Sequence, residues 1–276
     1  MTIPEAIALP LGRSGADGST ERFVLTGHAR GPWDELAAHG GAPAALLARA
    51  IERIGADSGM RLVSLQAAFL GPVLLGEIEI ETEVLKPGRK QMVVSARLTG
   101  RGRTLIAATG VLLRRGEVPL PEGIEAPGVR PMPSRESGRE VVEGIWAGSG
   151  GTAFHRTSNS IVVVTGGPED SRAEGAAWFR LDCPVVPGES PSPAERAAAA
   201  ADFGNGLAHP IPFEDYVFVN CDLNLWLLRE PVGEWIGVNS ATEVSANGSG
   251  LTATTLHDDA GRFGAAGQVL YVDSVG

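Results

Sequence analysis

The segment DYVFVNCDLNLWLLREPVGEW, from Asp215 to Trp235, is the stretch around which the chain is organised. Apolar residues recur at every second position, which is the period of a β-strand. One face carries Val217, Val219, Cys221, Leu223, Leu225 and Leu227, and the other carries Asn220, Asp222, Asn224 and Trp226. A carboxylate in so apolar a segment is costly unless it is hydrated, paired or used in chemistry. Asp222 is therefore a candidate catalytic residue, with a solvated strand face as the alternative.

Length, composition and charge favour a globular protein with room for two domains. The chain has 276 residues, of which 43% are hydrophobic and 20% are charged, so it can bury a sizeable core. Its net charge of −10 argues against a nucleic-acid or anionic-membrane partner, because phosphate binding needs a basic surface. A small anionic ligand remains compatible with this charge, since a few local Arg or Lys residues would suffice.

The cysteines and the N-terminal segment indicate a cytoplasmic protein. Cys183 and Cys221 are the only cysteines, and both stand in apolar, strand-like surroundings. We expect two buried, reduced thiols, with a disulfide or a reactive thiol as the alternative. The start, MTIPEAIALPLG, lacks a basic region and is interrupted by proline and glycine, so it does not resemble a signal peptide. No uncharged apolar run reaches the length of a membrane span, so we expect a soluble chain with no membrane insertion.

The first half of the chain predicts one helix followed by an antiparallel meander. Gly40-Gly41 precedes PAALLARAIERI, in which apolar residues recur at helical spacing until Gly55. The predicted strands are Arg61–Leu70, Gly76–Leu85, Gln91–Thr99 and Thr104–Leu113. Glutamates alternate with apolar residues in the second of these strands, which indicates a sheet with one solvated face.

A proline-rich segment from Glu117 to Glu140 separates this half from a second half that repeats it. In the second half Ser192 is a plausible N-cap for the helix PAERAAAAADFGNG. The predicted strands of this half are Ile161–Thr165, Gly175–Asp182, Tyr216–Leu228, Gly233–Ala246, Gly250–His257 and Phe263–Val272. GEIEIETEV from Gly76 resembles GEWIGVNSATEV from Gly233, and AATGVLL from Ala107 resembles AAGQVLY from Ala265. The repeat predicts a pseudo-twofold arrangement with sites between the copies.

The ordered set of these blocks resembles the double hotdog acyl-CoA thioesterases of the thioesterase II type. The blocks are the Gly40-Gly41 helix, CDLNLWLLREPVGEW, NSATEVSANGSG, LHDDAGR and AAGQVLYV. The resemblance implies an α+β fold with two tandem antiparallel sheets, each wrapped around one long helix. It divides the chain into an N-terminal hotdog at 1–116, a linker at 117–145 and a C-terminal hotdog at 146–276. It further implies a homo-oligomer in fatty acid metabolism that hydrolyses acyl-CoA, or a related acyl thioester, to free fatty acid and thiol without a cofactor or metal.

In that family an Asp, a Ser or Thr, and a Gln from the C-terminal half hold the attacking water. By resemblance these positions match Asp222, Thr242 and Gln268, and Ser240 competes with Thr242 because both lie on one strand face. The residues support the same set, because a buried glutamine amide needs several hydrogen-bond partners. Ordinary structural roles remain open for each: a solvated strand aspartate, a strand threonine and a polar residue in the core.

The start of the first helix is the candidate oxyanion site. Free N–H groups and the helix dipole would stabilise a developing negative charge, and Gly40 and Gly41 would let the backbone approach closely. A plain helix start is the alternative, and the neighbouring His39 is more often an incidental loop residue. Gly110 stands in the first half where Gln268 stands in the second, so we expect one working site per chain.

Other chemistries find little support in the sequence. There is no G-x-S-x-G motif, the histidines are scattered, and the glycine-rich segments near 148 and 165 lack a following Lys-Ser/Thr. A hotdog hydratase would need a paired Asp and His in a G-D-x-N-P-x-H-like run, which is missing. A non-catalytic acyl-thioester-binding or assembly module is the main alternative, because a fold does not determine an activity.

Overall fold

The computed structural model describes residues 5–14, 19–124, 131–141 and 151–275. The helices are α1 (Gly41–Gly55), α2 (Phe154–Thr157), α3 (Pro193–Ala201) and α4 (Gly204–Leu207). The strands are β1 (Ala8–Ser14), β2 (Thr20–Leu25), β3 (Met60–Phe69), β4 (Gly76–Lys86), β5 (Gln91–Gly100), β6 (Arg103–Arg114), β7 (Arg139–Glu140), β8 (Asn159–Thr165), β9 (Glu174–Leu181), β10 (Tyr216–Asn220), β11 (Asp222–Leu227), β12 (Trp235–Ser245), β13 (Ser249–Asp258) and β14 (Gly261–Ser274).

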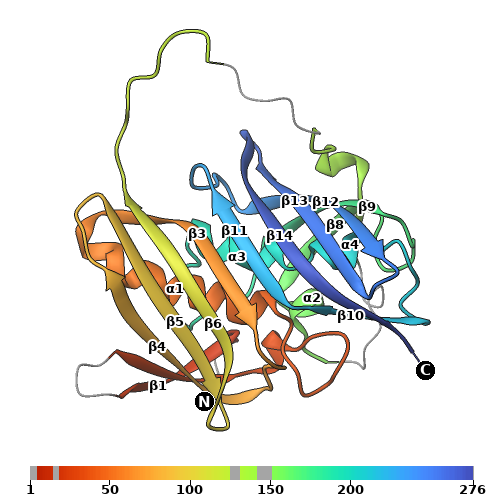
Figure 1. The fold of residues 1–276 in the computed structure, drawn as a ribbon, viewed down its shortest axis with the longest axis horizontal. Helices are drawn as coiled ribbons and strands as arrows, with labels where there is room; N and C mark the ends of the chain where they lie inside the picture. Colours follow the sequence, from red (N-terminus) through yellow and green to blue (C-terminus); the bar gives the residue numbers. More distant parts are fainter. Residues whose placement is uncertain (1–4, 15–18, 125–130, 142–150, 276) are drawn as a thin grey trace.

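Among the described residues these strands form one 14-stranded sheet whose order mirrors itself about its middle. The order is β1-β2-β4-β5-β6-β3-β11-β14-β13-β12-β9-β8-β7, with β10 pairing to β14 off this path. β3 and β11 meet as an antiparallel pair, so the two halves join edge to edge (Figure 1). The repeated sequence blocks fall on mirror-related strands, β4 with β12 and β6 with β14. The predicted internal repeat is therefore present in the topology.

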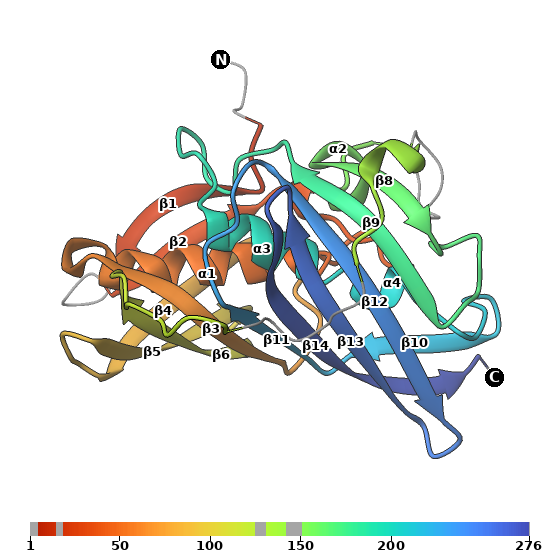
Figure 2. The ribbon, with the colours of Figure 1, turned by 90° about the horizontal axis from the view of Figure 1, so that it is seen from above.

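Helices α1 and α3 lie against each other on the concave side of the sheet, which curves around them (Figure 2). Helix α1 is buried over most of its surface, as its largely apolar sequence requires. Gly41 allows α3 to approach closely, because a Cβ at this position would lie 2.5 Å from the Ala199 carbonyl oxygen. The small alanine side chains of α3 serve the same contact. One core of buried residues therefore runs through both halves.

The predicted long strand from Tyr216 to Leu228 is interrupted at Cys221, where β10 ends and β11 begins. Asn220 pairs with Leu270 on β14, whereas Asn224 pairs with Gly267, so the register shifts by one residue between them. A shift of one residue turns the following side chains to the opposite face of a sheet. Before the shift Val217 and Val219 are exposed, and after it the odd-numbered leucines of β11 are buried.

Three other expectations differ from the structure. The two predicted sheets are joined into one, because β3 and β11 leave no free edge between the halves. The second helix is short: α3 has nine residues against 15 in α1, and after the turn at Asp202 and Phe203 the chain continues as the separate helix α4. Both cysteines are free, but Cys221 is exposed because it stands at the register shift.

The segment after β6 leads away from the sheet as extended chain (Figure 1), and residues 125–130 and 142–145 of the expected linker lie outside the described residues. Its far end packs on the second half. The Pro131 carbonyl accepts a hydrogen bond from Asn239, and the Pro133 carbonyl accepts one from the Trp178 indole.

Candidate active site

A cavity of about 610 Å³ opens at the N-terminus of α1, between the two halves. Its walls come from the loop at 31–34, the start of α1, the turn after α3 and strand β10. Trp33, Phe69, Phe213 and Phe218 supply aromatic surface, so most of the cavity is apolar. The polar residues His39, Asp202 and Asn220 also line it. An apolar pocket with a few convergent polar groups is the usual form of a small-molecule site.

The carboxylate of Asp202 is the centre of these polar groups. Asp202 caps the C-terminal end of α3 and is only 4% exposed. Asn220 Nδ2 donates to Asp202 Oδ1 over 2.8 Å, and His39 Nδ1 lies 2.9 Å from Asp202 Oδ2. Gln268 Nε2 lies 3.4 Å from both Asp202 Oδ1 and the Asp202 backbone oxygen. A buried carboxylate needs such donors, because an unpaired buried charge is expensive.

Two amide oxygens at this centre remain without a donor. Asn220 Oδ1 and Gln268 Oε1 are buried and have no hydrogen-bond partner among the described residues. Each amide directs its N–H₂ group to Asp202, which leaves the carbonyl oxygen as a free acceptor. A buried acceptor of this kind is suited to receive a hydrogen from a bound water or ligand.

The structure does not place Asp222 at this centre. Its Oδ1 accepts the Val269 backbone N–H at 2.7 Å, and its Oδ2 accepts from Asn224 Nδ2 at 2.9 Å. The register shift at Cys221 puts Asp222 on the outer face with Trp226 and Val269, whereas Gln268 points inward and is 1% exposed. The expected meeting of Asp222 with Gln268 is therefore wrong, because it requires an unbroken strand and the register shifts between Asn220 and Asn224. Asp222 instead bonds the backbone N–H next to the shift.

Of the other expected water ligands, Gln268 is at the centre and Thr242 is not bonded to it. Thr242 Oγ1 pairs with Thr252 Oγ1 at 2.8 Å, and Ser240 Oγ pairs with Thr254 Oγ1 at the same distance. A Cβ at Gly204 would lie 2.9 Å from Gln268 Oε1 and 3.1 Å from Ser240 Oγ. Of Ser240 and Thr242, it is therefore Ser240 whose hydroxyl lies near the Gln268 amide, beside Gly204.

The two glycines before α1 differ in their surroundings. Gly40 lines the cavity, and a Cβ there would lie 2.7 Å from Asp202 Oδ2, so the carboxylate rests against the glycine. The Gly41 N–H donates to His39 Nδ1 over 3.1 Å. Both lie at the positive end of the α1 dipole, where negative charge is favoured.

Sequence reasoning missed Asp202 and used Asn220 only as a neighbour of Asp222. One signal was available in the repeat. Pro193 precedes Asp202 by the same interval at which Pro43, in the first turn of α1, precedes Glu52. Each half therefore carries a carboxylate near the end of its helix. In the structure each carboxylate meets the N-terminus of the other helix, Asp202 at Gly40 and Glu52 at Ser192.

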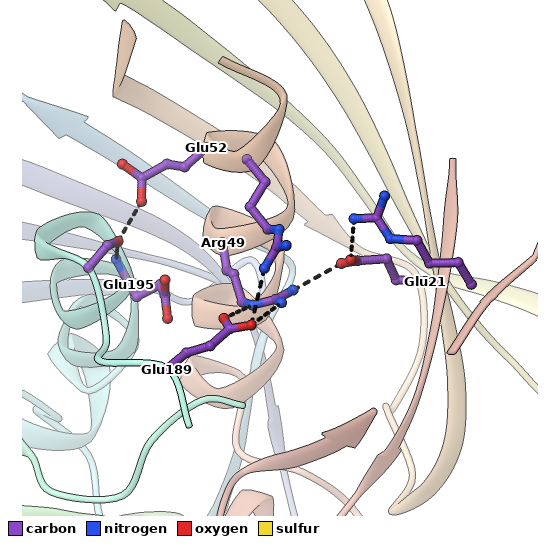
Figure 3. A network of polar contacts seen from close by, with 8 residues as sticks. Glu21, Arg49, Glu52, Glu189 and Glu195 are labelled. Atoms are coloured by element: carbon purple, nitrogen blue, oxygen red, sulfur yellow. Dashed lines mark hydrogen bonds and ion pairs between the residues drawn. The ribbon is translucent and has the colours of Figure 1, made fainter. Parts of the chain in front are cut away.

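A network of charged residues surrounds Glu52 (Figure 3). Ser192 Oγ donates to Glu52 Oε2, and the Ser192 hydroxyl also accepts the Glu195 N–H at 3.1 Å, as an N-cap does. Arg49 forms a two-pronged ion pair with Glu189 at 2.6 and 2.8 Å. Burial raises the pKa of Glu52, and it raises that of Glu195 to about 7. This arrangement ties the two helices together.

The first half also lacks a counterpart of the Gln268 amide. A Cβ at Gly110 would lie 2.6 Å from Ile51 Cγ2, so hydrocarbon from α1 occupies the space that a side chain would need. This supports the expectation of one working site per chain.

Comparison with known proteins identifies the family. The sequence model of the acyl-CoA thioesterase N-terminal domain matches residues 29–113, and that of the acyl-CoA thioesterase C-terminal domain matches residues 126–272. The chain therefore belongs to the acyl-CoA thioesterase family and is a thioester hydrolase. The family expected from the sequence is confirmed. No curated protein matches the chain.

Solved structures show the same fold at low sequence identity. A thioesterase II candidate from Thermobifida fusca is 20% identical with a TM-score of 0.70, covering 95% of this chain and 94% of that chain. A protein with a hotdog fold from Alicyclobacillus acidocaldarius is 16% identical with a TM-score of 0.70, covering 94% and 95%. The acyl-CoA thioesterase II TesB2 of Mycobacterium marinum is 14% identical with a TM-score of 0.65, covering 96% and 95%. The fold is thus a hotdog fold. Within the described residues no helix has the length and apolar character needed to cross a membrane.

Proposed function

We propose that the chain is a double hotdog enzyme that hydrolyses acyl-CoA to free fatty acid and thiol at one site, with Asp202 holding the attacking water. The N-terminal hotdog would span 1–116, the linker 117–145 and the C-terminal hotdog 146–276. The observation that carries the proposal is the buried carboxylate of Asp202 in an apolar cavity, with amides from Asn220 and Gln268 directed at it. Asn220 takes the place that the sequence resemblance assigned to a Ser or Thr.

The proposed reaction is a single attack by water on the thioester carbonyl. The water donates one hydrogen to the Asp202 carboxylate and the other to a free amide oxygen, on Asn220 or Gln268. Its oxygen is then oriented toward the carbonyl carbon, and the C–O bond forms as the proton passes to Asp202. The tetrahedral intermediate collapses when the C–S bond breaks, and the protonated Asp202 returns its proton to the leaving thiolate.

The negative charge on the carbonyl oxygen would develop at the N-terminus of α1. Gly40 lines the cavity there, and the backbone N–H groups of Gly40 and Gly41 are the proposed donors. Helix N–H groups are fixed in direction, so they stabilise an oxyanion without reorganising during the reaction. The acyl chain would lie along the aromatic walls formed by Trp33, Phe213 and Phe218.

A matched pair of isosteric substitutions tests the assignment. Asp202→Asn removes the base and should lower kcat on a panel of acyl-CoAs by about 10²–10⁴-fold, the usual contribution of general acid–base catalysis. Asp222→Asn makes the same chemical change on the outer face and should leave kcat within about twofold of the unsubstituted enzyme. Thermal unfolding would establish that both variants are folded. Full activity in Asp202→Asn together with loss in Asp222→Asn would refute the proposal, and absence of turnover on every chain length would favour an acyl-binding module.

A further inference from the structure

His39 lies between the two groups that the proposed reaction needs. Its Nδ1 is 2.9 Å from Asp202 Oδ2, the proposed base, and 3.1 Å from the backbone nitrogen of Gly41, a proposed oxyanion donor. The ring packs between Phe154 and Phe203, with centroid distances of 5.1 and 4.3 Å. The side chain is 12% exposed and lines the cavity. A histidine held so firmly against both groups is not an incidental loop residue.

One ring nitrogen cannot serve both neighbours at the same time. Nδ1 carries either a hydrogen or an in-plane lone pair. With a lone pair it accepts the Gly41 N–H, but it then offers no hydrogen to the Asp202 oxygen that lies 2.9 Å away. With a hydrogen it donates to Asp202, but it can no longer accept from Gly41. The two contacts therefore compete for a single position on the imidazole.

We propose that His39 is a positioning residue that couples the base to the oxyanion site through the tautomer of its ring. When Nδ1 has the lone pair, the Gly41 N–H is occupied and the oxyanion site is incomplete. When the hydrogen moves from Nε2 to Nδ1 by exchange with water in the cavity, Nδ1–H orients the Asp202 carboxyl group and the Gly41 N–H is released for the thioester carbonyl oxygen. The exchange moves one proton between two nitrogens of the same ring, so the charge of the site does not change. The inference rests on the proposed function.

Two substitutions separate this role from ring packing. His39→Phe keeps a ring between Phe154 and Phe203 but removes the nitrogen. His39→Asn removes the ring but places an amide N–H near the position of Nδ1, from which it can donate to Asp202. If His39 only packs, the Phe variant retains activity and the Asn variant loses it. If Nδ1 positions Asp202, the order is reversed.

The kinetic experiment uses the full chain and the best acyl-CoA substrate of the panel. His39→Phe should lower kcat by about 10–100-fold with KM changed by less than about threefold, a loss somewhat below that of removing an oxyanion donor. The kcat of His39→Asn should be at least about tenfold higher than the kcat of His39→Phe. Thermal unfolding identifies any variant that fails to fold, and a misfolded Phe variant would be replaced by His39→Leu. Equal kcat in His39→Phe and the unsubstituted enzyme, or no recovery in His39→Asn, overturns the inference.

A spectroscopic measurement reads the tautomer directly. Nitrogen-15 NMR of the histidine side chains, assigned to His39 by comparison with His39→Phe, reports whether Nδ1 bears a hydrogen. Adding a non-hydrolysable acyl-CoA analogue, in which a methylene replaces the thioester sulfur and the carbonyl is kept, should convert Nδ1 from a hydrogen-free to a hydrogen-bearing nitrogen, and an unchanged Nδ1 would overturn the coupling. Different results would reject the proposed function and the coupling through His39. Activity in Asp202→Asn rejects the proposed function, whereas an inactive Asp202→Asn with a fully active His39→Phe rejects the coupling alone.

Discussion

Replacing Gly40 by alanine should separate the catalytic geometry of Asp202 from the stability of the fold. An ideal Cβ at residue 40 would lie 2.7 Å from Asp202 Oδ2 and 2.9 Å from Asp202 Oδ1. Ordinary van der Waals contact begins at 3.4 Å, so the nearer oxygen must move by 3.4 − 2.7 = 0.7 Å or the carboxylate must rotate. Either change disturbs the hydrogen bond that Asn220 donates to Oδ1.

The expected effect on catalysis follows from this displacement. A misplacement of about 1 Å in a catalytic group can cost about 10²-fold in rate, so a shift of several tenths of an ångström should lower kcat by roughly 10–100-fold. Stability should change little. Gly40 has φ −59° and ψ −26°, a conformation that alanine adopts readily. The smaller entropy of the unfolded alanine chain gains about 0.4–1 kcal/mol, which offsets the poorer capping of alanine at a helix N-terminus.

The assay is hydrolysis of acyl-CoA followed by thiol release, with Tm measured on the same preparations. Gly71→Ala is a matched control, because Gly71 lines the same cavity and a Cβ there would meet only Leu105 Cδ2, at 3.8 Å. We expect a Tm within a few degrees of the unsubstituted enzyme for both variants and a loss of kcat in Gly40→Ala alone. An unchanged kcat in Gly40→Ala would show that the position of the Asp202 carboxylate does not limit the reaction. An equal loss in both variants would point to the cavity wall instead.

Two further predictions concern the helix pair and the acyl pocket. Because burial raises the pKa of Glu195 to about 7 from 4.5, the folded state binds a proton more tightly than the unfolded state, and stability should fall as pH rises from about 4.5 to about 7. The fall in the free energy of unfolding is at most about 3.4 kcal/mol, at about 1.36 kcal/mol per pKa unit. Urea unfolding across this pH range should show a smaller fall in Glu195→Gln. The fall that remains would come from Glu52, whose pKa burial also raises. Phe213 lies against Trp33 and His209 in the wall of the cavity. Phe213→Ala enlarges this part of the cavity, so kcat/KM for long acyl chains should rise several-fold relative to kcat/KM for short ones. An unchanged chain-length preference would place the acyl group elsewhere.

The elements that depend on local pattern could be predicted from the sequence. Three such features depend only on residues close together in the sequence, and the structure confirms them. They are the apolar period of α1, the Ser192 cap of α3 and the alternation of Glu77–Glu83 along β4. The repeat between β4 and β12 indicated the mirrored sheet, because similar sequences fold into similar units. The joining of the halves was not visible, since the pairing of β3 with β11 depends on edges that approach only in the folded chain.

The candidate site was harder to predict because one register shift decides it. Residues 217–227 alternate without interruption in the sequence, and an unbroken strand would place Asp222 on the same face as Asn220. The shift at Cys221 turns Asn220 inward and Asp222 outward, and no glycine or proline marks it. Bulges without such a signal are set by tertiary pairing, here by the Cys221 N–H donating to the Val269 carbonyl and the Cys221 carbonyl accepting from Phe69.

The same contact between a carboxylate and a helix N-terminus occurs in both halves, with different surroundings. In each, the N-terminus of one helix meets a carboxylate near the end of the other, because α1 and α3 pack side by side in opposite directions. Glu52 accepts from the Ser192 hydroxyl at the start of α3, and Arg49, also on α1, pairs with Glu189 just before α3, so these contacts hold the helices together. Around Asp202 the matching helix begins with glycine, which offers no side chain to bond, and the cavity opens there instead. A serine at one helix start therefore accompanies a closed polar contact, whereas a glycine at the other accompanies an open cavity.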